Sequence, residues 1–298
     1  MSVSQKQIVI TGAKGQLGLT LQSLWEDSEL QHDFELCCTD IEEMDITSCQ
    51  SIRDYLGKRQ VEAIINTAAY TAVDKAEAEP ELAYSINSNG AENIANFAHE
   101  HGCKLIHIST DFVFSGSKDS PYFPDDETGP LSVYGKSKLA GEQAILSKCP
   151  DRSTILRTSW LYSQFQSNFV KTMLRLLQER EELNVVDDQI GAPTSTNSLI
   201  ELIFKVLAAN DSSGIYHWSD SGNISWYDFA LEIQKQGLVA GIINSEIPIN
   251  PILTEKYPTP AQRPSYSVLD TEGTQERFSI APKPWKESLQ QVIQKLAA

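Results

Sequence analysis

Residues 12–18 read Gly12-Ala13-Lys14-Gly15-Gln16-Leu17-Gly18, a glycine-rich turn between two regular elements. The apolar run at 7–11 predicts a short strand before it, and apolar residues at helical spacing predict a helix after it. Glycines in this position allow a tight turn and close approach of the backbone, and the helix N-terminus then faces a pyrophosphate. An ordinary strand-to-helix turn is the alternative. The context favours a dinucleotide-binding turn that uses Gly12, Gly15 and Gly18.

The second apolar run, at 34–39, ends at Asp40. An acid at this point typically accepts hydrogen bonds from the ribose hydroxyls of adenosine and repels a 2′-phosphate. Lys14, inside the glycine-rich turn, could instead meet such a phosphate. The pattern therefore leans to NAD and leaves NADP open. Asp45 and Ile46 follow, where an acid and a backbone amide could lie against the adenine.

Strands and helices alternate along the first half of the chain. Apolar runs at 61–66 and 104–108 predict strands, and apolar spacing over 81–101 predicts a helix between them. This order implies an α/β, Rossmann-type doubly wound parallel sheet with its ligand at the carboxyl ends of the strands. The alternation loosens near residue 160. We therefore expect a dinucleotide-binding domain at 1–160 and a smaller, mainly substrate-binding part at 161–298, with some segments returning to the sheet.

Tyr134 and Lys138 stand four residues apart at the start of a helix predicted over 133–145. That spacing puts phenol and ammonium on one helix face. A nearby cation favours phenolate, so we expect Lys138 to lower the pKa of Tyr134 and to make it a proton donor and acceptor near neutral pH. Such pairs also arise by chance on solvated helices. The glycine-rich turn and the strand end at Thr110 favour a functional pair, with Thr110 and Tyr134 at the mouth of a nicotinamide site.

Two other segments could bind ligands. Residues 115–130 are rich in Ser, Pro, Gly and Asp and predict a surface loop, whose acidic triplet at 125–127 is interpreted as a solvated turn, with a metal site as the alternative. The proline-rich tail at 248–264 surrounds Arg263. This tail could close over a substrate with Arg263 on a phosphate, or it could be an extended surface wrap.

The composition is ordinary for a globular protein except for its charge. The chain has 298 residues, a net charge of −16 and 41% hydrophobic residues. An acidic surface argues against nucleic acid or an anionic membrane as the partner, although backbone amides can still hold a small anion. The five cysteines are odd in number and form no C-x-x-C motif, which favours reduced thiols in a cytoplasmic protein. We expect neither a signal peptide nor a membrane span.

Several longer motifs are spread over nearly the whole chain. They are Asn66-Thr67-Ala68-Ala69-Tyr70-Thr71-Ala72-Val73-Asp74, Ser109-Thr110-Asp111-Phe112-Val113-Phe114, Tyr134-Gly135-Lys136-Ser137-Lys138-Leu139-Ala140-Gly141-Glu142, Arg157-Thr158-Ser159-Trp160, Asp188-Gln189-Ile190-Gly191-Ala192-Pro193-Thr194 and Tyr257-Pro258-Thr259-Pro260-Ala261-Gln262-Arg263-Pro264. With the glycine-rich turn, they resemble the extended short-chain dehydrogenase/reductase family. The turn and the Tyr134/Lys138 pair specify only the superfamily, whereas the later motifs resemble its reductases of nucleotide-linked 4-keto sugars.

The resemblance implies NADPH or NADH as cofactor and dTDP-4-dehydro-L-rhamnose as substrate, reduced at its C4 keto group in nucleotide-sugar and cell-surface polysaccharide biosynthesis. It implies that Tyr134 is the general acid and that Lys138 holds the nicotinamide ribose. It further implies pyrophosphate contacts from Gly15, Gln16 and Leu17, adenosine contacts from Asp40, Asp45 and Ile46, cofactor contacts from Ala69, Tyr70 and Thr71, and sugar contacts from Thr110, Asp111 and Trp160.

Two positions depart from the family pattern. Ile108 stands where relatives can carry a tyrosine that touches the cofactor, and Thr20 stands where some carry a glutamate for a magnesium site between subunits. We therefore expect no metal, and both a monomer and a homodimer stay open. Two alternative functions also stay open. One is another sugar-nucleotide epimerase, dehydratase or reductase, and the other is a non-catalytic NADP-binding regulatory subunit like the methionine adenosyltransferase β subunit, which the chain also resembles.

Overall fold

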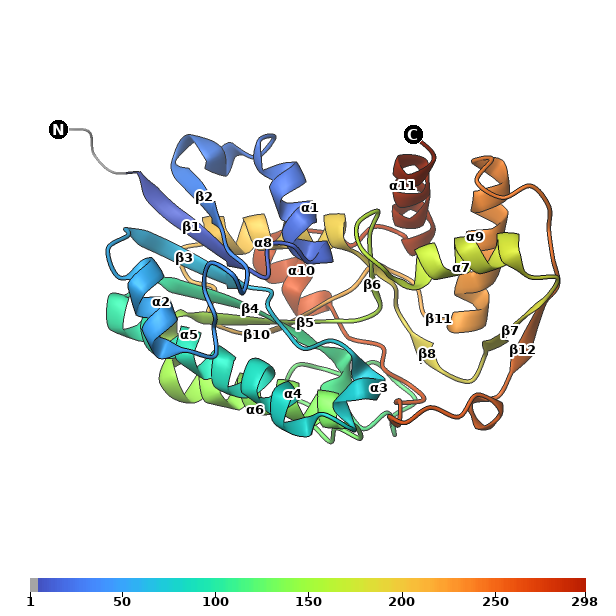
Figure 1. The fold of residues 1–298 in the computed structure, drawn as a ribbon, viewed down its shortest axis with the longest axis horizontal. Coiled ribbons are helices and arrows are strands. Elements are labelled where there is room, and N and C mark those ends of the chain that lie inside the picture. The colour runs from blue at the N-terminus through green and yellow to red at the C-terminus, as the bar shows by residue number, and fades with distance from the viewer. Residues whose placement is uncertain (1–4) are drawn as a thin grey trace.

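A six-stranded parallel sheet forms the centre of the computed structural model, which describes residues 5–298 (Figure 1). Its strand order is β10-β5-β4-β3-β1-β2. Because β2 and β3 lie on opposite sides of β1, the winding reverses there and leaves a crevice at the carboxyl ends of the strands. The predicted α/β doubly wound fold is confirmed. The strands are β1 (Lys6–Thr11), β2 (Phe34–Cys38), β3 (Val61–Asn66), β4 (Lys104–Thr110), β5 (Ser153–Thr158) and β10 (Gly214–Trp218).

Helices cover both faces of this sheet, as buried parallel strands require. Successive residues of β1 serve the two faces, since Ile8 and Ile10 belong to one hydrophobic core and Val9 to the other. The first core is closed by α1 (Gln16–Trp25), α8 (Thr196–Ala208) and α10 (Glu272–Phe278). The second is closed by α2 (Cys49–Leu56), α5 (Ala91–His101) and α6 (Val133–Lys148).

The helix predicted over 81–101 is formed by three consecutive pieces. They are α4 (Pro80–Tyr84), a π-helical turn (Ser85–Gly90) and α5, preceded by the short α3 (Val73–Ala76). The first piece begins at Pro80 because proline is tolerated in the first helical turn. In the wide turn, Asn87 Oδ1 accepts a hydrogen bond from Tyr70 N at 2.8 Å, so the turn is tied to the segment after β3.

A third hydrophobic core lies in the C-terminal half, around α7 (Phe169–Glu179), α9 (Trp226–Val239) and α11 (Trp285–Ala297). Figure 1 shows these three helices gathered apart from those that cover the sheet. Three two-stranded sheets accompany them. They are parallel β7 (Leu183–Val186) with β12 (Ile249–Ile252), antiparallel β8 (Ile190–Gly191) with β11 (Ile224–Ser225), and parallel β6 (Leu161–Tyr162) with β9 (Thr194–Ser195).

Residues after 160 thus divide between the two halves of the molecule. The sheet half takes α8, β10 and α10, and the C-terminal half takes the remaining long helices. Short 3-10 turns complete the chain at Glu29–His32, Asp111–Val113, Pro150–Arg152 and Thr254–Lys256. Within residues 5–298, no helix has both the length and the apolar character needed to cross a membrane.

Candidate active site

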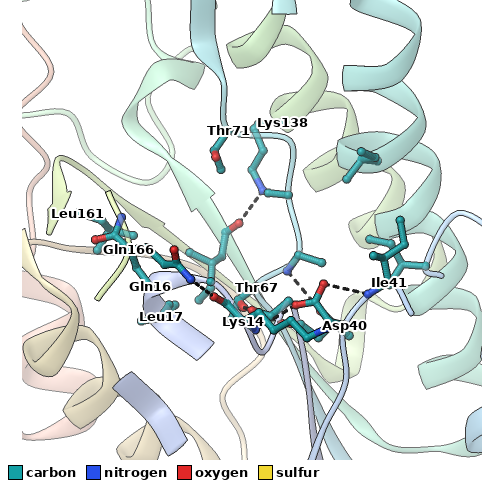
Figure 2. A pocket seen from close by; sticks show the side chains of 18 of the residues that line it. Lys14, Gln16, Leu17, Asp40, Ile41, Thr67, Thr71, Lys138, Leu161 and Gln166 are labelled. Atoms are coloured by element: carbon teal, nitrogen blue, oxygen red, sulfur yellow. Dashed lines mark hydrogen bonds between the residues drawn. The ribbon is translucent and has the colours of Figure 1, made fainter. Parts of the chain in front are cut away.

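A cavity of about 600 Å³ lies at the carboxyl ends of β1, β3 and β4. In Figure 2, Lys14, Gln16 and Asp40 lie close together, while Thr71 and Lys138 lie on the other side of the cavity. The structure therefore brings residues predicted for the two ends of a dinucleotide into one space. Those that line it are Gly12, Gly15, Gln16, Leu17, Asp40, Asp45, Ile46, Ala69, Thr71, Tyr134 and Lys138.

The glycine-rich turn packs tightly against the end of β3. Gly12 has a φ of 64°, and a Cβ there would come within 2.9 Å of the Ala68 backbone. Gly15 N donates to Gly12 O at 3.0 Å, and α1 begins directly after Gly15. Gly18 lies outside the lining. A Cβ on Gly18 would come within 2.6 Å of Ala13, so this third glycine serves the packing of α1 on the turn.

At the end of the cavity where the sequence predicts the adenosine, the turn is tied to the end of β2 through Asp40. Its Oδ2 accepts from Lys14 N at 3.0 Å and its Oδ1 from Ile41 N at 2.9 Å. Lys14 Nζ pairs with Glu42 Oε2 at 2.7 Å, and this hydrogen bond raises the pKa of Lys14. The cation considered for a 2′-phosphate is therefore shared with a carboxylate, although both side chains are exposed to solvent.

At the other end, α6 presents Tyr134 and Lys138 to the cavity. Ser132 caps this helix by accepting a hydrogen bond from Gly135 N at 3.2 Å. Lys138 is 2% exposed, and its Nζ donates to Ile108 O at 2.6 Å and lies 3.2 Å from His107 Nε2. Burial disfavours the charged amine and lowers the pKa of Lys138 to about 8.

The structure corrects the expected pKa of Tyr134. Burial raises it to about 12, with a further rise from Asp111 and an opposing effect of Thr110. The Lys138 ammonium makes its hydrogen bonds to β4, so it does not provide the expected lowering. The prediction of a lowered pKa is therefore wrong in this structure, and Tyr134 stays a protonated phenol at neutral pH.

Thr110 and Asp111 stand beside Tyr134 without lining the cavity. Thr110 Oγ1 donates to Asp111 Oδ1 at 3.0 Å and accepts from Phe112 N at 3.2 Å. Burial raises the pKa of Asp111 to about 6. Its Oδ2 is buried and has no hydrogen-bond partner among residues 5–298.

Three further predicted contact residues lie outside the lining. The Tyr70 hydroxyl donates to Glu79 Oε2 at 2.6 Å. Trp160 stacks on Trp226 with ring centroids 3.5 Å apart. Arg263 donates from its two terminal nitrogens to both oxygens of Asp74, at 3.1 and 2.9 Å. The structure thus places the Arg263 guanidinium on a carboxylate of α3, where the sequence suggested a phosphate.

The segment that follows β6 forms part of the cavity wall, which the sequence analysis did not predict. Gln166 and Ser167 line the cavity, and Gln166 Nε2 donates to Lys14 O at 2.8 Å. Gln16 Oε1 accepts from both Ser163 Oγ and Asn168 Nδ2 at 3.0 Å. The only signal in the sequence is a cluster of Ser, Gln and Asn at 163–168, which does not reveal its distant partner.

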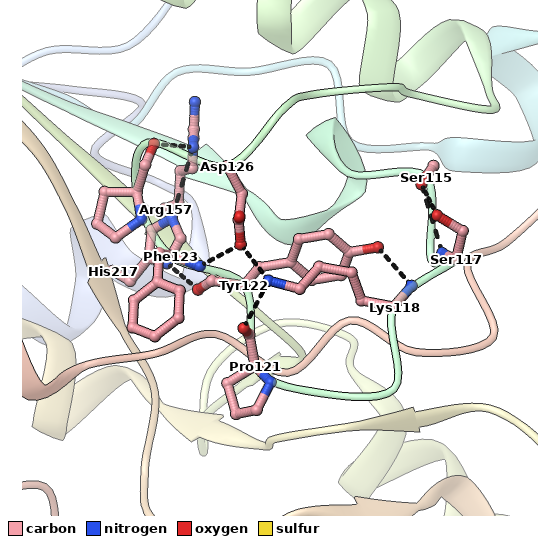
Figure 3. A network of polar contacts seen from close by, with 10 residues as sticks. Ser115, Ser117, Lys118, Pro121, Tyr122, Phe123, Asp126, Arg157 and His217 are labelled. Atoms are coloured by element: carbon pink, nitrogen blue, oxygen red, sulfur yellow. Dashed lines mark hydrogen bonds and ion pairs between the residues drawn. The ribbon is translucent and has the colours of Figure 1, made fainter.

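The positions considered for a metal are engaged in other contacts. Thr20 is buried, donates to Gln16 O at 2.8 Å and lies 2.7 Å from the Thr196 hydroxyl, so this position joins α1 to α8. In the acidic loop, Asp126 pairs with Lys118 at 2.5 Å (Figure 3). Across residues 5–298, no group of three or more His, Cys, Asp or Glu side chains is arranged to hold a metal ion.

Comparison with known proteins identifies the family. The family model described as the RmlD substrate binding domain matches residues 6–298. A dTDP-4-dehydrorhamnose reductase of Aggregatibacter actinomycetemcomitans is 40% identical over 291 residues, covering 96% of this chain and 98% of the relative. The crystal structure of a dTDP-4-dehydrorhamnose reductase of Clostridium acetobutylicum superposes with a TM-score of 0.90 at 40% identity, covering 98% of this chain and 100% of that chain. That of Bacillus anthracis, in complex with NADP, gives 0.90 at 36% identity with the same coverage. The chain therefore belongs to the RmlD substrate binding domain family, the family of the dTDP-4-dehydrorhamnose reductases.

Proposed function

We propose that the protein catalyses the NAD(P)H-dependent reduction of the C4 keto group of dTDP-4-dehydro-L-rhamnose to dTDP-L-rhamnose, in nucleotide-sugar biosynthesis for cell-surface polysaccharides. The observation that carries this proposal is the meeting of Tyr134 and Lys138 with the glycine-rich turn in one cavity. Relatives that match nearly the whole chain are named for this reaction, and one related structure contains NADP.

The cavity lining fits a nicotinamide dinucleotide, which supplies the hydride when bound. Gly12 leaves the space that a Cβ would fill beside β3, and α1 begins at the turn, so its first amides can bind a pyrophosphate. Asp40 is suited to the adenosine ribose, and Lys138 is suited to the nicotinamide ribose. Asp45, Ile46, Ala69 and Thr71 line the space between or beside these two points.

Tyr134 is the proposed general acid. Because its pKa is raised to about 12, the phenol is protonated at neutral pH and can donate its proton to the alkoxide that forms at O4 of the sugar. We assign Thr110 to stabilising that alkoxide: its hydroxyl stands beside the phenol, and it would do so by turning its O–H away from Asp111 Oδ1. We assign Asp111 and Trp160 to the sugar. We assign Arg263, through Asp74, to holding the tail beside α3.

We infer that the enzyme acts in the cytoplasm on this small molecule, as a monomer or homodimer, without nucleic acid, membrane or metal. The five cysteines, which are all free thiols, support a reducing compartment. The net charge of −16 supports the absence of a polyanionic partner.

The test is to follow oxidation of NADPH and of NADH with enzymatically prepared dTDP-4-dehydro-L-rhamnose and to identify the product by mass. A reductase consumes free cofactor in proportion to a product that is heavier than the substrate by a pair of hydrogens. An epimerase or dehydratase would instead keep a tightly bound cofactor through turnover. Cofactor binding without any turnover would contradict the proposal and favour a regulatory subunit.

A further inference from the structure

Four buried polar side chains form a continuous row beside the cavity, from Thr11 through Asn66 and His107 to Lys138. Thr11 Oγ1 lies 2.7 Å from Asn66 Oδ1, and Asn66 Nδ2 lies 3.1 Å from His107 Nδ1. His107 Nε2 lies 3.2 Å from Lys138 Nζ. Each of the four residues is at most 2% exposed, and the two ends of the row, Thr11 and Lys138, line the cavity.

The register of the sheet builds this row. Thr11 pairs with Asn66 across β1 and β3, and Asn66 pairs with His107 across β3 and β4, so the three side chains point to one face. The residues that precede them in their strands are apolar and buried, as central parallel strands require. A row of polar side chains in such a core is tolerated only if its hydrogen bonds are satisfied. The alternative is that this row of polar side chains only packs the strands together and has no role in function.

The partners of His107 determine which ring nitrogen carries its proton. Burial, with a contribution from Lys138, lowers the pKa of His107 well below its ordinary value, so the imidazole is neutral and has one N–H. The Lys138 ammonium has only donors, and Nε2 must accept from it. The hydrogen therefore lies on Nδ1. The structure has Asn66 Nδ2 on His107 Nδ1 and Asn66 Oδ1 on Thr11, so this tautomer requires the Asn66 amide to be flipped, with its oxygen on Nδ1–H and its nitrogen on Thr11.

Building on the proposed reductase function, we propose that His107 is a positioning residue: its Nε2 and the Ile108 carbonyl together fix the Lys138 ammonium so that it can hold the nicotinamide ribose beside Tyr134. Two acceptors, at 2.6 and 3.2 Å from Nζ, occupy two of its three N–H bonds and leave the third for the cavity. His107 itself is absent from the lining and touches no ligand there. It acts through Lys138.

The proposal makes a specific prediction about charge. A hydrogen bond to the ammonium favours the charged form, so His107 opposes the lowering of the Lys138 pKa by burial. Glu142, on the same helix and paired with Arg157 of β5, also favours the charged form. Tyr134 of α6 faces the same end of the cavity, and Asp111 lies beyond it. Loss of the imidazole alone should therefore lower the pKa of Lys138.

Two substitutions separate the contacts of the imidazole. His107→Asn keeps an amide within reach of Asn66 and removes the acceptor for Lys138, whereas His107→Gln extends an amide oxygen to the place of Nε2. We expect His107→Asn to lower kcat on the order of 10–100-fold, as small displacements of catalytic groups do, with the KM for the sugar little changed. The alkaline limb of the pH profile of kcat for His107→Asn should move to lower pH, because Lys138 would lose its proton at a lower pH. His107→Gln should keep the wild-type limb and most of kcat.

An unmoved alkaline limb in His107→Asn, or a His107→Gln enzyme as slow as His107→Asn, would overturn the proposal. Nitrogen-15 NMR of histidine-labelled wild-type protein gives a measurement that does not depend on the folding of a variant. We expect Nδ1 protonated and Nε2 accepting across the pH range of activity. An Nε2–H tautomer in active wild-type enzyme would contradict the role of His107, whereas wild-type protein without turnover would contradict the proposed function instead.

Discussion

The two ends of the cavity use charge in opposite ways. At the end proposed for adenosine, Lys14 and Glu42 form an ion pair whose side chains are 61% and 62% exposed. At the end proposed for the nicotinamide, Lys138 is 2% exposed and its pKa is lowered to about 8. Solvent screens the first pair, whereas burial controls the protonation of the second group. On the proposed function, recognition of the cofactor would rest on weak, exchangeable charges, while proton transfer would depend on a few desolvated groups.

The residues around Lys138 show how buried charges are stabilised at this end of the cavity. Arg157 donates to both oxygens of Glu142, at 2.7 to 3.2 Å, and Ser109 donates to the same carboxylate. Figure 3 shows Arg157 and His217 beside the loop that carries Tyr122 and Asp126. A buried charge is tolerated here because each donor and acceptor has a partner. The following predictions test this difference, beginning with the largest expected effect.

Replacement of Tyr134 by Phe should give the largest effect. It removes the general acid but keeps the ring, which packs edge-on against Phe112. We expect turnover to fall about 10²–10⁴-fold, with NADPH affinity measured by fluorescence little changed. Tyr216→Phe is the matched control, because the hydroxyl of this β10 residue donates to Ser213 O and should not affect turnover. Reduction of the sugar by Tyr134→Phe at the wild-type rate would show that another group supplies the proton.

Glu142→Gln tests whether the buried ion pair between Glu142 and Arg157 stabilises the fold at this end of the cavity. It leaves the Arg157 charge buried without its counter-ion, so we expect the free energy of unfolding to fall by about 3–5 kcal/mol. Urea unfolding would measure this change. The control is Glu179→Gln, which breaks an exposed pair with Arg175 and should change stability little. Equal losses in the two variants would remove the energetic distinction between buried and exposed charges.

Lys138→Met tests the energetic effect of the buried ammonium through pH. The folded-state pKa of Lys138 is about 8, below its usual 10.5. Its contribution to stability is therefore fully present above about pH 10.5 and is lost as the pH falls through 8, by up to about 3 kcal/mol. We expect wild-type unfolding to show this rise in stability between about pH 8 and 10.5. The Lys138→Met variant should lack it, and the exposed control Lys136→Met should keep it.

The fold and the meeting of the glycine-rich turn with Asp40 could be predicted from the sequence because their signals are local. A strand, a glycine turn and a helix are contiguous, Asp40 ends an apolar run, and Tyr134 and Lys138 are one helical turn apart. Each of these patterns needs only the geometry of a single element and its neighbours.

Contacts between distant residues could not be predicted in this way. Gln166 meets Lys14 across 152 residues, and Arg263 meets Asp74 across 189. His107 looked like an ordinary strand residue until the sheet register placed it beside Asn66. The prediction of a lowered pKa for Tyr134 was wrong for a related reason. Helical spacing indicates which residues share a face, but not how deeply that face is buried or which acceptors the ammonium finds on β4.

Asp40→Asn tests recognition at the exposed end, where a smaller effect is expected. The substitution removes a negative charge from the place expected to meet the adenosine ribose, while an amide oxygen can still accept from Lys14 N. We expect the affinity for NADPH to rise about fivefold relative to NADH, since charges about 4 Å apart in water interact by about 1 kcal/mol. Fluorescence titration of both cofactors measures the ratio. An unchanged ratio would exclude Asp40 as a determinant of cofactor preference.

The smallest effect should come from Glu42→Gln, because both members of its pair with Lys14 lie in solvent. We expect no measurable change in the free energy of unfolding, since such pairs gain little in water. The freed Lys14 ammonium should still shift the NADPH to NADH affinity ratio upward, by less than Asp40→Asn does, because it gains freedom to meet a 2′-phosphate. Added salt should remove this shift, whereas the pH dependence set by the buried Lys138 should persist in salt. A shift that survives high salt would mean that this end of the cavity is less open to solvent than the exposed fractions of Lys14 and Glu42 indicate.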